Sequence, residues 1–360
     1  MSKTISILVK PASSSCNLNC TYCFYHDISQ QRRSTNHGIM KQEVVVTLIE
    51  RIAEALEEEG TVNISFQGGE PTSAGLSYFQ TFVDLLAQYP TIQANYSLQT
   101  NGIQIDEAWC TFFKKHHFLI GMSLDGYETI TNQYRIDQNG NGVFNSVLAA
   151  IALLEKFDVP YNILTVLTKS LAEHPKALFA FYQAHHFQFI QLIPCLPFLN
   201  EKENAMSLTP RLYESFYLSF FQAFLSDLKK GGQMSINLFD QIAGMLQGYA
   251  PYQCGMLGNC QIQYIVEANG DVYPCDFYCT DSYCLGNISA HTFAQLAKTN
   301  VAKKFIQEGS CQKEICQTCP YQKICHGGCR RQNVCYLEND YCAHQRVLDV
   351  LVPSLLALFR

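Results

Sequence analysis

Seventeen cysteines, gathered in two distant groups, constrain this chain more than any other feature of its 360 residues. Three lie within residues 16–23, two lie in the long stretch that follows, and twelve lie between Cys254 and Cys342. The first residues contain neither the apolar stretch nor the small-residue cleavage site of a secretory signal, so we expect a cytoplasmic, reducing environment. Because disulfides rarely form there, so many thiols indicate metal or cluster ligation at two sites separated by a cysteine-poor body.

The composition narrows the class of protein. Apolar residues make up 48% of the chain and charged residues 16%, which is typical of a soluble globular protein. No run of about 18 uncharged apolar residues occurs, so we expect no membrane-spanning segment. The formal net charge is -6 and no long cluster of Lys and Arg occurs, whereas nucleic-acid binding needs many cations. We therefore expect a polypeptide partner, with no nucleic acid and no membrane.

The first two thirds of the chain alternate between short apolar runs and amphipathic helical stretches, the pattern of a parallel sheet with crossover helices. The predicted strands are Ile5–Lys10, Val62–Phe66, Tyr96–Gln99, Leu119–Leu124, Tyr161–Leu167 and Phe189–Cys195. The predicted helices between them are Gln42–Glu58, Tyr78–Tyr89, Asp106–His116, Phe144–Phe157 and Pro175–His185. Six such units predict an α/β fold, a partial (β/α)6 barrel.

The pattern changes after the sixth strand. We expect a long helix over Leu208–Lys230, a second helix around Leu238–Tyr249 and a hairpin over Gln263–Cys275 that turns at Asn269–Gly270. Gly231–Gly232 is either a hinge or the C-cap of the long helix. We therefore divide the chain into a barrel domain, residues 1–230, and a cysteine-rich domain with a C-terminal helix, residues 231–360.

Polar and glycine-rich segments follow the first four strands. They are the cysteine triad, Gln67–Pro71, Thr100–Gly102 and Asp125–Gly126. In parallel α/β folds the loops at the carboxyl ends of the strands meet on one face and collect the ligands. The sequence therefore predicts a site on that face.

The first cysteine group has the spacing C-x3-C-x2-C, formed by Cys16, Cys20 and Cys23. Three thiolates can hold a cubane iron-sulfur cluster and leave its fourth iron open for a substrate or cofactor. A zinc site is the alternative, and His26 is available as its fourth ligand.

At this point the sequence resembles the radical S-adenosylmethionine (SAM) superfamily, in which such a triad binds a 4Fe-4S cluster and SAM chelates the open iron. Gln67-Gly68-Gly69-Glu70-Pro71 resembles the superfamily's motif that cradles the methionine amino group of SAM. The paired glycines let the backbone approach closely. Without the triad upstream, this segment would be interpreted as an ordinary turn.

The resemblance is closer still to the anaerobic sulfatase-maturating enzymes and extends over nearly the whole chain. It rests on the segments Lys10–Ser14, Cys23–His26, Ser97–Gly102 and Ser123–Gly126. The implied SAM contacts are Tyr22, Gly69 of the Gly-Gly motif, Ser123, Arg135 and Leu196. Without the resemblance, Arg135 would be interpreted as a surface cation and Leu196 as strand core.

The second cysteine group supplies eight regularly spaced thiols, enough for two fully ligated clusters or for two zinc sites. It resembles the SPASM extension of peptide-modifying radical SAM enzymes. The resemblance implies one 4Fe-4S cluster on Cys254, Cys260, Cys275 and Cys329, and another on Cys316, Cys319, Cys325 and Cys342. The spacing of the cysteines alone does not show that Cys329 binds the first of these two clusters. Cys110 and Cys195 are expected to pack as small apolar residues. Cys279, Cys284, Cys311 and Cys335 are expected to lie near the clusters as extra thiols, and their role, including a chemistry outside the sulfatase pattern, is left open.

The resemblance implies an oxidoreductase that converts a Cys or Ser of a sulfatase to Cα-formylglycine by means of a 5′-deoxyadenosyl radical and three 4Fe-4S clusters. It also implies that Asp276, directly after Cys275, accepts a proton. We expect flavodoxin or ferredoxin as electron donor, and a monomer. The alternatives are a maturase that installs a thioether or carbon-carbon crosslink in a ribosomally made peptide, and a non-enzymatic zinc-binding interaction protein.

Overall fold

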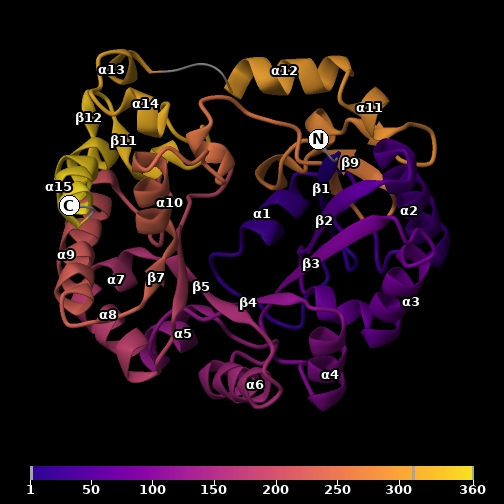
Figure 1. Ribbon diagram of the computed structural model, residues 1–360, viewed down its shortest axis with the longest axis horizontal. Helices are drawn as coiled ribbons and strands as arrows, with labels where there is room; N and C mark the ends of the chain where they lie inside the picture. The colour runs from indigo at the N-terminus through magenta and orange to yellow at the C-terminus, as the bar shows by residue number, and fades with distance from the viewer. Residues whose placement is uncertain (1–2, 310–312, 359–360) are drawn as a thin grey trace. The chain divides into compact units, whose positions relative to one another are not determined.

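The structure of the protein is a computed structural model that describes residues 3–309 and 313–358 (Figure 1). Cys311 lies outside the described residues. The described residues form two compact units that are interleaved along the chain. The first unit comprises Met1–Ser123, Arg135–Tyr161 and Gln261–Ile306, and the second comprises Leu124–Tyr134, Asn162–Cys260 and Gln307–Arg360. The predicted boundary after residue 230, between a barrel domain and a cysteine-rich domain, remains a prediction.

The first unit is built on a parallel sheet. Its strands are β1 (Thr4–Val9), β2 (Gly60–Phe66), β3 (Ile92–Thr100), β4 (Leu119–Ser123), β8 (Ile265–Val266), β9 (Asp271–Tyr273) and β10 (Gly286–Asn287). The order across the sheet is β10-β9-β8-β1-β2-β3-β4, so the late hairpin joins the edge beside the first strand. In the pairing of β1 with β2, Ile7 lies opposite Ile64 and Val9 opposite Phe66. This register aligns the buried positions of the two strands on one face.

The helices of the first unit each bury apolar residues. They are α1 (Phe24–Gln30), α2 (Gln42–Leu56), α3 (Leu76–Leu86), α4 (Glu107–Lys115), α6 (Phe144–Lys156) and α11 (Phe293–Leu296), and α12 (Asn300–Gly309) continues into the second unit. In α2 the buried positions include Val45, Leu48, Ile49 and Ile52, which recur at helical spacing. The helix α2 packs against β1 and β2 and next to α3 (Figure 1).

The second unit contains the parallel strands β5 (Tyr161–Leu167), β6 (Phe189–Pro194) and β7 (Ser235–Ile236). Its longer helices are α5 (Glu128–Tyr134), α8 (Pro175–Ala184), α9 (Pro210–Leu228), α10 (Asn237–Leu246) and α15 (Ala343–Leu358). Short elements lie between them: α7 (Lys169–Ala172), α13 (Glu314–Gln317), α14 (Gln322–Cys325), β11 (Leu337–Glu338) and β12 (Tyr341–Cys342). Aromatic side chains of α9, among them Phe216 and Phe220, are fully buried.

The predicted elements are confirmed. Each of the six predicted strands and five predicted helices is present, and so are the two helices and the hairpin that follow them. Gly231, with a φ of 90°, follows α9 and donates its N–H to the carbonyl of Leu228, so the pair of glycines caps the helix. The helices α1 and α5 were not predicted.

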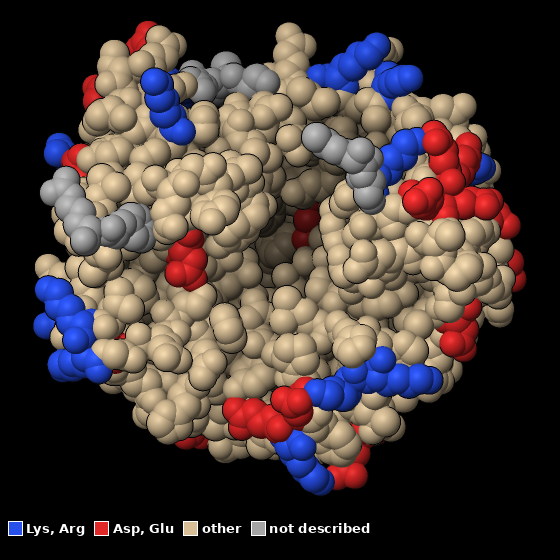
Figure 2. Space-filling model, in the orientation of Figure 1, with Lys and Arg blue, Asp and Glu red and all other residues tan. Residues whose placement is uncertain are grey.

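Charged side chains of both signs are mixed on the surface. On the face shown in Figure 2, Lys and Arg side chains lie in several separate groups with Asp and Glu side chains among them. None of the helices within the described residues is long and apolar enough to cross a membrane.

Candidate functional site

The first cysteine triad lies in the loop between β1 and α1. Cys16, Cys20 and Cys23 are half-buried, and α1 begins directly after Cys23. The backbone N–H of Leu18 donates to Cys16 Sγ over 3.4 Å. Burial raises the pKa of Cys23, while the N–H groups of Tyr25 and His26 bond to its sulfur and act in the opposite direction. Backbone donors aimed at cysteine sulfurs are what cluster thiolates use.

The electrostatics of the triad fit a positively charged occupant. Burial, together with the charges of Glu70, Cys20 and Cys23, raises the pKa of Cys16 to about 12. Thiolates this close repel one another, so they ionise together when cations bind between them. His26, which the zinc alternative needs as a ligand, has an exposed side chain. The residues present therefore fit a cluster held by three thiolates.

The Gly-Gly loop after β2 is bonded to the segment that leads into the triad. Gly69 N–H donates to the carbonyl of Ser13 over 2.9 Å, and Glu70 N–H donates to that of Ser15 over 2.8 Å. A Cβ added to Gly69 would lie 2.1 Å from the Ser15 carbonyl oxygen, so no other residue fits there. Gly68 has a φ of 122°, which side chains rarely allow. The two loops that the sequence assigned to cluster and SAM therefore lie together.

Glu70 organises this region rather than facing outward. Its buried carboxylate accepts hydrogen bonds from Thr72 N–H at 3.0 Å, Thr100 Oγ1 at 2.8 Å and Asn101 N–H at 2.8 Å. Asn101 Nδ2 in turn donates to Asn17 Oδ1 over 2.7 Å and lies 3.9 Å from Cys16 Sγ. Glu70 thus links the loop after β3 to the Gly-Gly loop, a role that the SAM-binding prediction did not include.

The remaining predicted SAM contacts fall in different places. Tyr22 and Arg135 are buried, and the Arg135 guanidinium carbon lies 5.6 Å from the centroid of the Tyr22 ring. Interpreting Arg135 as a surface cation would therefore have been wrong. Ser123 is half-buried at the end of β4 in the first unit. Leu196 is half-buried and belongs to the second unit.

Asp276 lies among buried polar groups in the first unit. It begins the short 3₁₀ helix η3 (Asp276–Tyr278) that follows the β8–β9 hairpin. The Lys10 ammonium lies 2.9 Å from Asp276 Oδ1, and the Tyr25 hydroxyl donates to Oδ2 over 2.6 Å. The Tyr25 oxygen is also 3.0 Å from Gln67 Oε1. Tyr25 therefore connects Asp276 to the first residue of the Gly-Gly motif.

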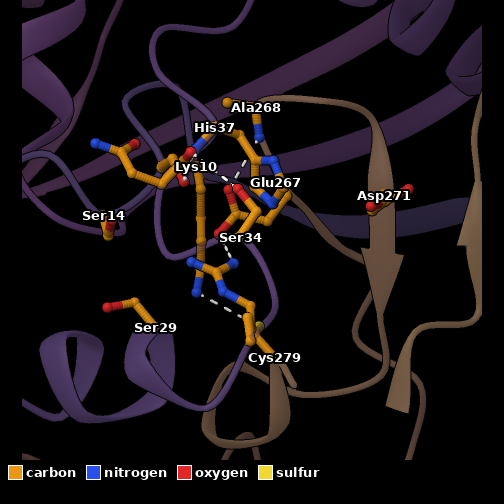
Figure 3. A network of polar contacts seen from close by, with 12 residues as sticks. Lys10, Ser14, Ser29, Ser34, His37, Glu267, Ala268, Asp271 and Cys279 are labelled. Carbon is orange, nitrogen blue, oxygen red and sulfur yellow. Dashed lines mark hydrogen bonds and ion pairs between the residues drawn. The ribbon is translucent and has the colours of Figure 1, made fainter. Parts of the chain in front are cut away.

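Further buried charges surround Lys10 and Asp276, and no pattern in the sequence predicted their roles. Arg32 Nη1 donates to Glu267 Oε1 over 2.6 Å, with both side chains almost fully buried. Lys10 reaches toward Cys279, and its Nζ lies 3.4 Å from Cys279 Sγ (Figure 3). Lys10 is a charged residue at the end of the apolar run Ile5–Val9, and this position could have indicated a functional role for it. Nothing in the sequence pairs Arg32 with Glu267.

Four cysteines of the second group come together within the second unit. Burial first, and then the charges of Cys342, Cys316 and Cys319, raise the pKa of Cys325 to about 12. The N–H of Gly327 bonds to Cys325, and the N–H of Gln345 donates to Cys342 Sγ over 3.4 Å. These thiols have the mutual proximity and the backbone donors seen at the first triad. They match the set that the resemblance implied for one auxiliary cluster.

The other implied set is divided between the units. Cys254, Cys260 and Cys329 belong to the second unit, and Cys275 belongs to the first. A Cβ added to Gly255 would lie 3.1 Å from Cys329 Cβ, and Cys329 adds to the burial that raises the pKa of Cys260. Cys329 is therefore near Cys254 and Cys260 although Cys316–Cys325 intervene in sequence. Across residues 3–309 and 313–358, no three Cys, His, Asp or Glu side chains converge as a single metal ion requires.

The other cysteines are mostly buried. Cys110 is fully buried in α4, which confirms its predicted packing role, and Cys195 is buried at the end of β6. Cys335 is fully buried and donates its thiol to the carbonyl of Cys195 over 3.5 Å. Cys284 is half-buried.

Comparisons with known proteins find the same family of enzymes along most of the chain. Residues 11–181 match the radical SAM superfamily, and residues 254–320 match the SPASM iron-sulfur cluster-binding domain. A cysteine-type anaerobic sulfatase-maturating enzyme of Clostridium novyi is 40% identical over 333 residues, 91% of this chain and 88% of that enzyme. A serine-type anaerobic sulfatase-maturating enzyme of Klebsiella pneumoniae is 28% identical over 351 residues, 96% of this chain and 87% of that enzyme.

Solved structures extend this agreement to the fold. Native anSMEcpe with bound AdoMet and Cp18Cys peptide matches with a TM-score of 0.91 and 35% identity, covering 99% of both chains. SuiB of Streptococcus suis, bound to precursor peptide SuiA, matches with a TM-score of 0.62 at 15% identity, covering 95% of this chain and 75% of SuiB, a likeness of fold. This chain, a radical SAM barrel followed by an iron-sulfur SPASM domain, belongs to the anaerobic sulfatase-maturating enzymes.

Proposed function

We propose that this enzyme oxidises a cysteine residue of a sulfatase polypeptide to Cα-formylglycine. The observation that carries the proposal is the contact of Asp276 with Tyr25, which in turn contacts Gln67 of the Gly-Gly motif. A carboxylate that accepts protons and the loop proposed to hold SAM are thereby held together in one unit. Cysteine rather than serine is proposed because the cysteine-type relatives are 40% identical and the serine-type relatives 28%.

The cofactor ligands follow from the cysteine sets. We propose that one cluster is held by Cys16, Cys20 and Cys23, and that two auxiliary clusters are held by the eight later cysteines assigned above. Tyr22, Gln67, Gly68, Gly69, Glu70, Ser123, Arg135 and Leu196 are proposed to bind or shape the site of SAM. When bound, these groups supply a one-electron oxidant that removes a hydrogen atom from the target residue, and a sink for the second electron.

The residues of the chain manage the proton. Oxidation of a thiol-bearing carbon toward a thioaldehyde releases the thiol proton, and Asp276 is proposed to accept it. Water then replaces the sulfur of the thioaldehyde by oxygen and releases hydrogen sulfide, which gives formylglycine. Tyr25 holds one carboxylate oxygen by a hydrogen bond, and Lys10 lies beside the other. The side chains of Lys10 and Asp276 are 3% and 14% exposed, which limits the access of bulk water to the carboxylate.

Several broader features belong to the same proposal. Residues 1–230 act as the radical SAM module and residues 231–360 as the auxiliary cluster module. Electrons come from a flavodoxin or ferredoxin in the cytoplasm, and the enzyme works as a monomer on a polypeptide substrate.

The test is anaerobic incubation of the reconstituted enzyme with SAM, a reductant and peptides that carry a Cys-x-Pro-x-Arg or a Ser-x-Ala-x-Arg core. Mass spectrometry distinguishes formylglycine from an internal crosslink, because only formylglycine replaces sulfur by oxygen and reacts with hydrazides. Formylglycine in the cysteine peptide is the expected product. A thioether or carbon-carbon crosslink, or an unchanged peptide beside active SAM cleavage, would refute the proposal.

Asp276→Asn keeps the shape of the side chain but removes the base. Formylglycine formation should slow by about 10²- to 10⁴-fold, the usual contribution of a positioned general base. SAM cleavage should fall much less, so the ratio of deoxyadenosine to oxidised peptide rises. Asp281→Asn is the matched control, because Asp281 begins the next 3₁₀ helix, η4 (Asp281–Tyr283), in the same way. Equal behaviour of the two variants would remove Asp276 from the mechanism.

A further inference from the structure

Lys10 is a buried lysine whose position is set by the sheet. Its side chain is 3% exposed, and its backbone N–H donates to the carbonyl of Val266 over 2.9 Å. The first atoms of its stem lie 3.3 Å from where a Cβ on Gly68 would be. The late hairpin and the Gly-Gly loop therefore confine both the backbone and the stem of Lys10.

The ammonium end of Lys10 is shared. It lies 2.9 Å from Asp276 Oδ1, 3.4 Å from Cys279 Sγ and 4.8 Å from the centroid of the Tyr25 ring. Figure 3 shows the extended side chain running from β1 toward Cys279, with Glu267 beside its stem. The ammonium is thus fixed by a carboxylate, a thiol and an aromatic face that come from distant parts of the sequence.

The charges in this cluster are balanced. The cations Lys10 and Arg32 face the carboxylates of Asp276 and Glu267. The Cys279 thiol donates its hydrogen to the carbonyl of Cys275 over 3.6 Å, and its sulfur lies 3.4 Å from the ammonium. Cys279 therefore supplies Lys10 with a neutral acceptor.

The two oxygens of Asp276 are held differently. Oδ2 accepts the hydrogen bond of Tyr25. Oδ1 is fully buried, and its partner is the Lys10 ammonium at 2.9 Å. The ammonium thus anchors the buried oxygen Oδ1 and Tyr25 holds Oδ2, so the orientation of the carboxylate is fixed at both oxygens.

We propose that Lys10 is a positioning residue for this reaction: with Cys279 as its second support, it anchors Oδ1 and so keeps the carboxylate of Asp276 in the orientation in which it accepts the proton. The inference rests on the proposed function of Asp276. Lys10 itself does not touch the reacting atoms. Cys279 is a thiol outside the ligand sets, and it gains a role as the support that keeps the ammonium over the carboxylate.

The test measures the ratio of deoxyadenosine to oxidised peptide in reconstituted holoenzyme. Lys10→Met keeps the unbranched stem that packs on Gly68 but removes the ammonium, and the ratio should rise about tenfold or more, since misplaced bases lose much of their effect. Lys10→Arg keeps the charge in a larger fork and should restore part of the coupling. A change confined to stability would leave the ratio of the folded, iron-loaded fraction unchanged.

Cys279→Ala removes the second support without changing charge, and should raise the same ratio about two- to tenfold, the weight of one modest hydrogen bond. Cys284→Ala is the matched control, because Cys284 is another cysteine of the same loop outside the ligand sets. Iron content and the unfolding midpoint identify the folded fraction. If Lys10→Met fails to fold because Asp276 is left uncompensated, Lys10→Arg and Cys279→Ala still decide the question.

The outcomes separate this inference from the proposed function. A wild-type ratio in Asp276→Asn removes the proposed function of Asp276 and this inference with it. Uncoupling in Asp276→Asn, together with wild-type ratios in the Lys10 variants, overturns this inference alone. Equal ratios in Cys279→Ala and Cys284→Ala overturn the part assigned to Cys279.

Discussion

The first cysteine triad and the last four ligand cysteines are held by very different amounts of structure. The triad lies between a strand of six residues, β1, and a helix of seven, α1, in a unit whose sheet is covered by longer helices. Cys316, Cys319, Cys325 and Cys342 lie in and around helices of four residues and strands of two, namely α13, α14, β11 and β12. Elements that short are not stable without tertiary support.

The comparison indicates that the two sites depend on their clusters for different reasons. The first cysteine triad lies in a unit that has its own apolar core. We therefore expect the first cluster to be needed for chemistry and not for folding. The region from residue 313 to Cys342 has few long elements, so ligation itself supplies much of its folding free energy. Replacing cysteines of the first triad should therefore abolish the chemistry and leave stability nearly unchanged. Replacing ligand cysteines of the later region should lower stability as well.

The largest effect should come from replacing Cys16, Cys20 and Cys23 together by Ala. SAM cleavage should vanish, and iron should fall from about 12 to about 8 per chain, because one of three clusters is lost. The unfolding midpoint should change little. Trp109, the single tryptophan, reports on the first unit, where it packs against Phe79 and Phe113.

Cys110→Ala should show the opposite pattern, because Cys110 is buried in α4 but is no ligand. It should keep all iron and all SAM cleavage and lose some stability. Residual deoxyadenosine production in the triple variant would refute the assignment of the first site.

Next in size is Cys342→Ala. Loss of this ligand should remove an auxiliary cluster and destabilise the region around it by about 5 kcal/mol or more, since cluster binding and folding are coupled there. Limited proteolysis should then cut between residues 313 and 342, while Trp109 still reports a folded first unit. Cys329→Ala should lose the other auxiliary cluster and lower solubility.

Cys335→Ala is the control for both ligand variants, because Cys335 is fully buried but lies outside the ligand sets. It should keep its iron. If Cys342→Ala and Cys329→Ala kept full iron and stability, the contrast between the two regions would fail and Cys335 or Cys311 would be better ligand candidates.

The elements that the sequence predicted well are those with strong periodicity. The helix at Gln42 and the strand at Val62 were found within two residues because their buried positions repeat regularly. The strand β3 begins at Ile92 rather than Tyr96, since Gln93 and Asn95 are exposed polar residues that weaken the strand pattern. Helix α1 was missed because it is short and follows the cysteine loop directly.

The site was predictable only in part. Local motifs predicted the triad and the Gly-Gly loop, and the resemblance pointed to Asp276. The contacts that hold Asp276 depend on the pairing of β8 with β1, which brings a hairpin near residue 270 to Lys10. Such a long-range register is not encoded in any short window, and buried charge pairs such as Arg32 with Glu267 follow from it.

A third prediction tests whether the first unit depends on buried charges rather than on iron. Glu267→Gln should destabilise the fold by about 3 to 5 kcal/mol, because the Arg32 charge loses its buried partner. Burial alone would raise the pKa of Glu267, but the charges of Lys10 and Arg32 outweigh it and lower that pKa. The carboxylate therefore stabilises the fold above the unfolded pKa of about 4.3 and stops doing so as pH falls through the lower folded pKa.

Denaturation followed by Trp109 fluorescence between neutral and acidic pH checks this sign. The loss of stability below about pH 4 should be smaller in Glu267→Gln than in the wild type. Glu59→Gln, at an exposed carboxylate of the same unit, is the control and should follow the wild-type curve. A Glu267→Gln variant as stable as the wild type at neutral pH would show that the buried pair contributes little.

The smallest expected effect is at the start of α4, where Asp106 caps the helix by accepting the N–H of Trp109 over 3.0 Å. Asp106→Ala should cost about 1 kcal/mol, because one N–H at the helix start loses its acceptor. This loss should be the same in holoenzyme and in enzyme whose clusters have been removed by a chelator, since the cap lies in a helix that packs on the sheet of the first unit. Denaturation followed by Trp109 fluorescence measures it in both states. A cap that mattered only in the iron-loaded protein would mean that the first unit also folds around its cluster, and the contrast between the two cysteine regions would then be one of degree.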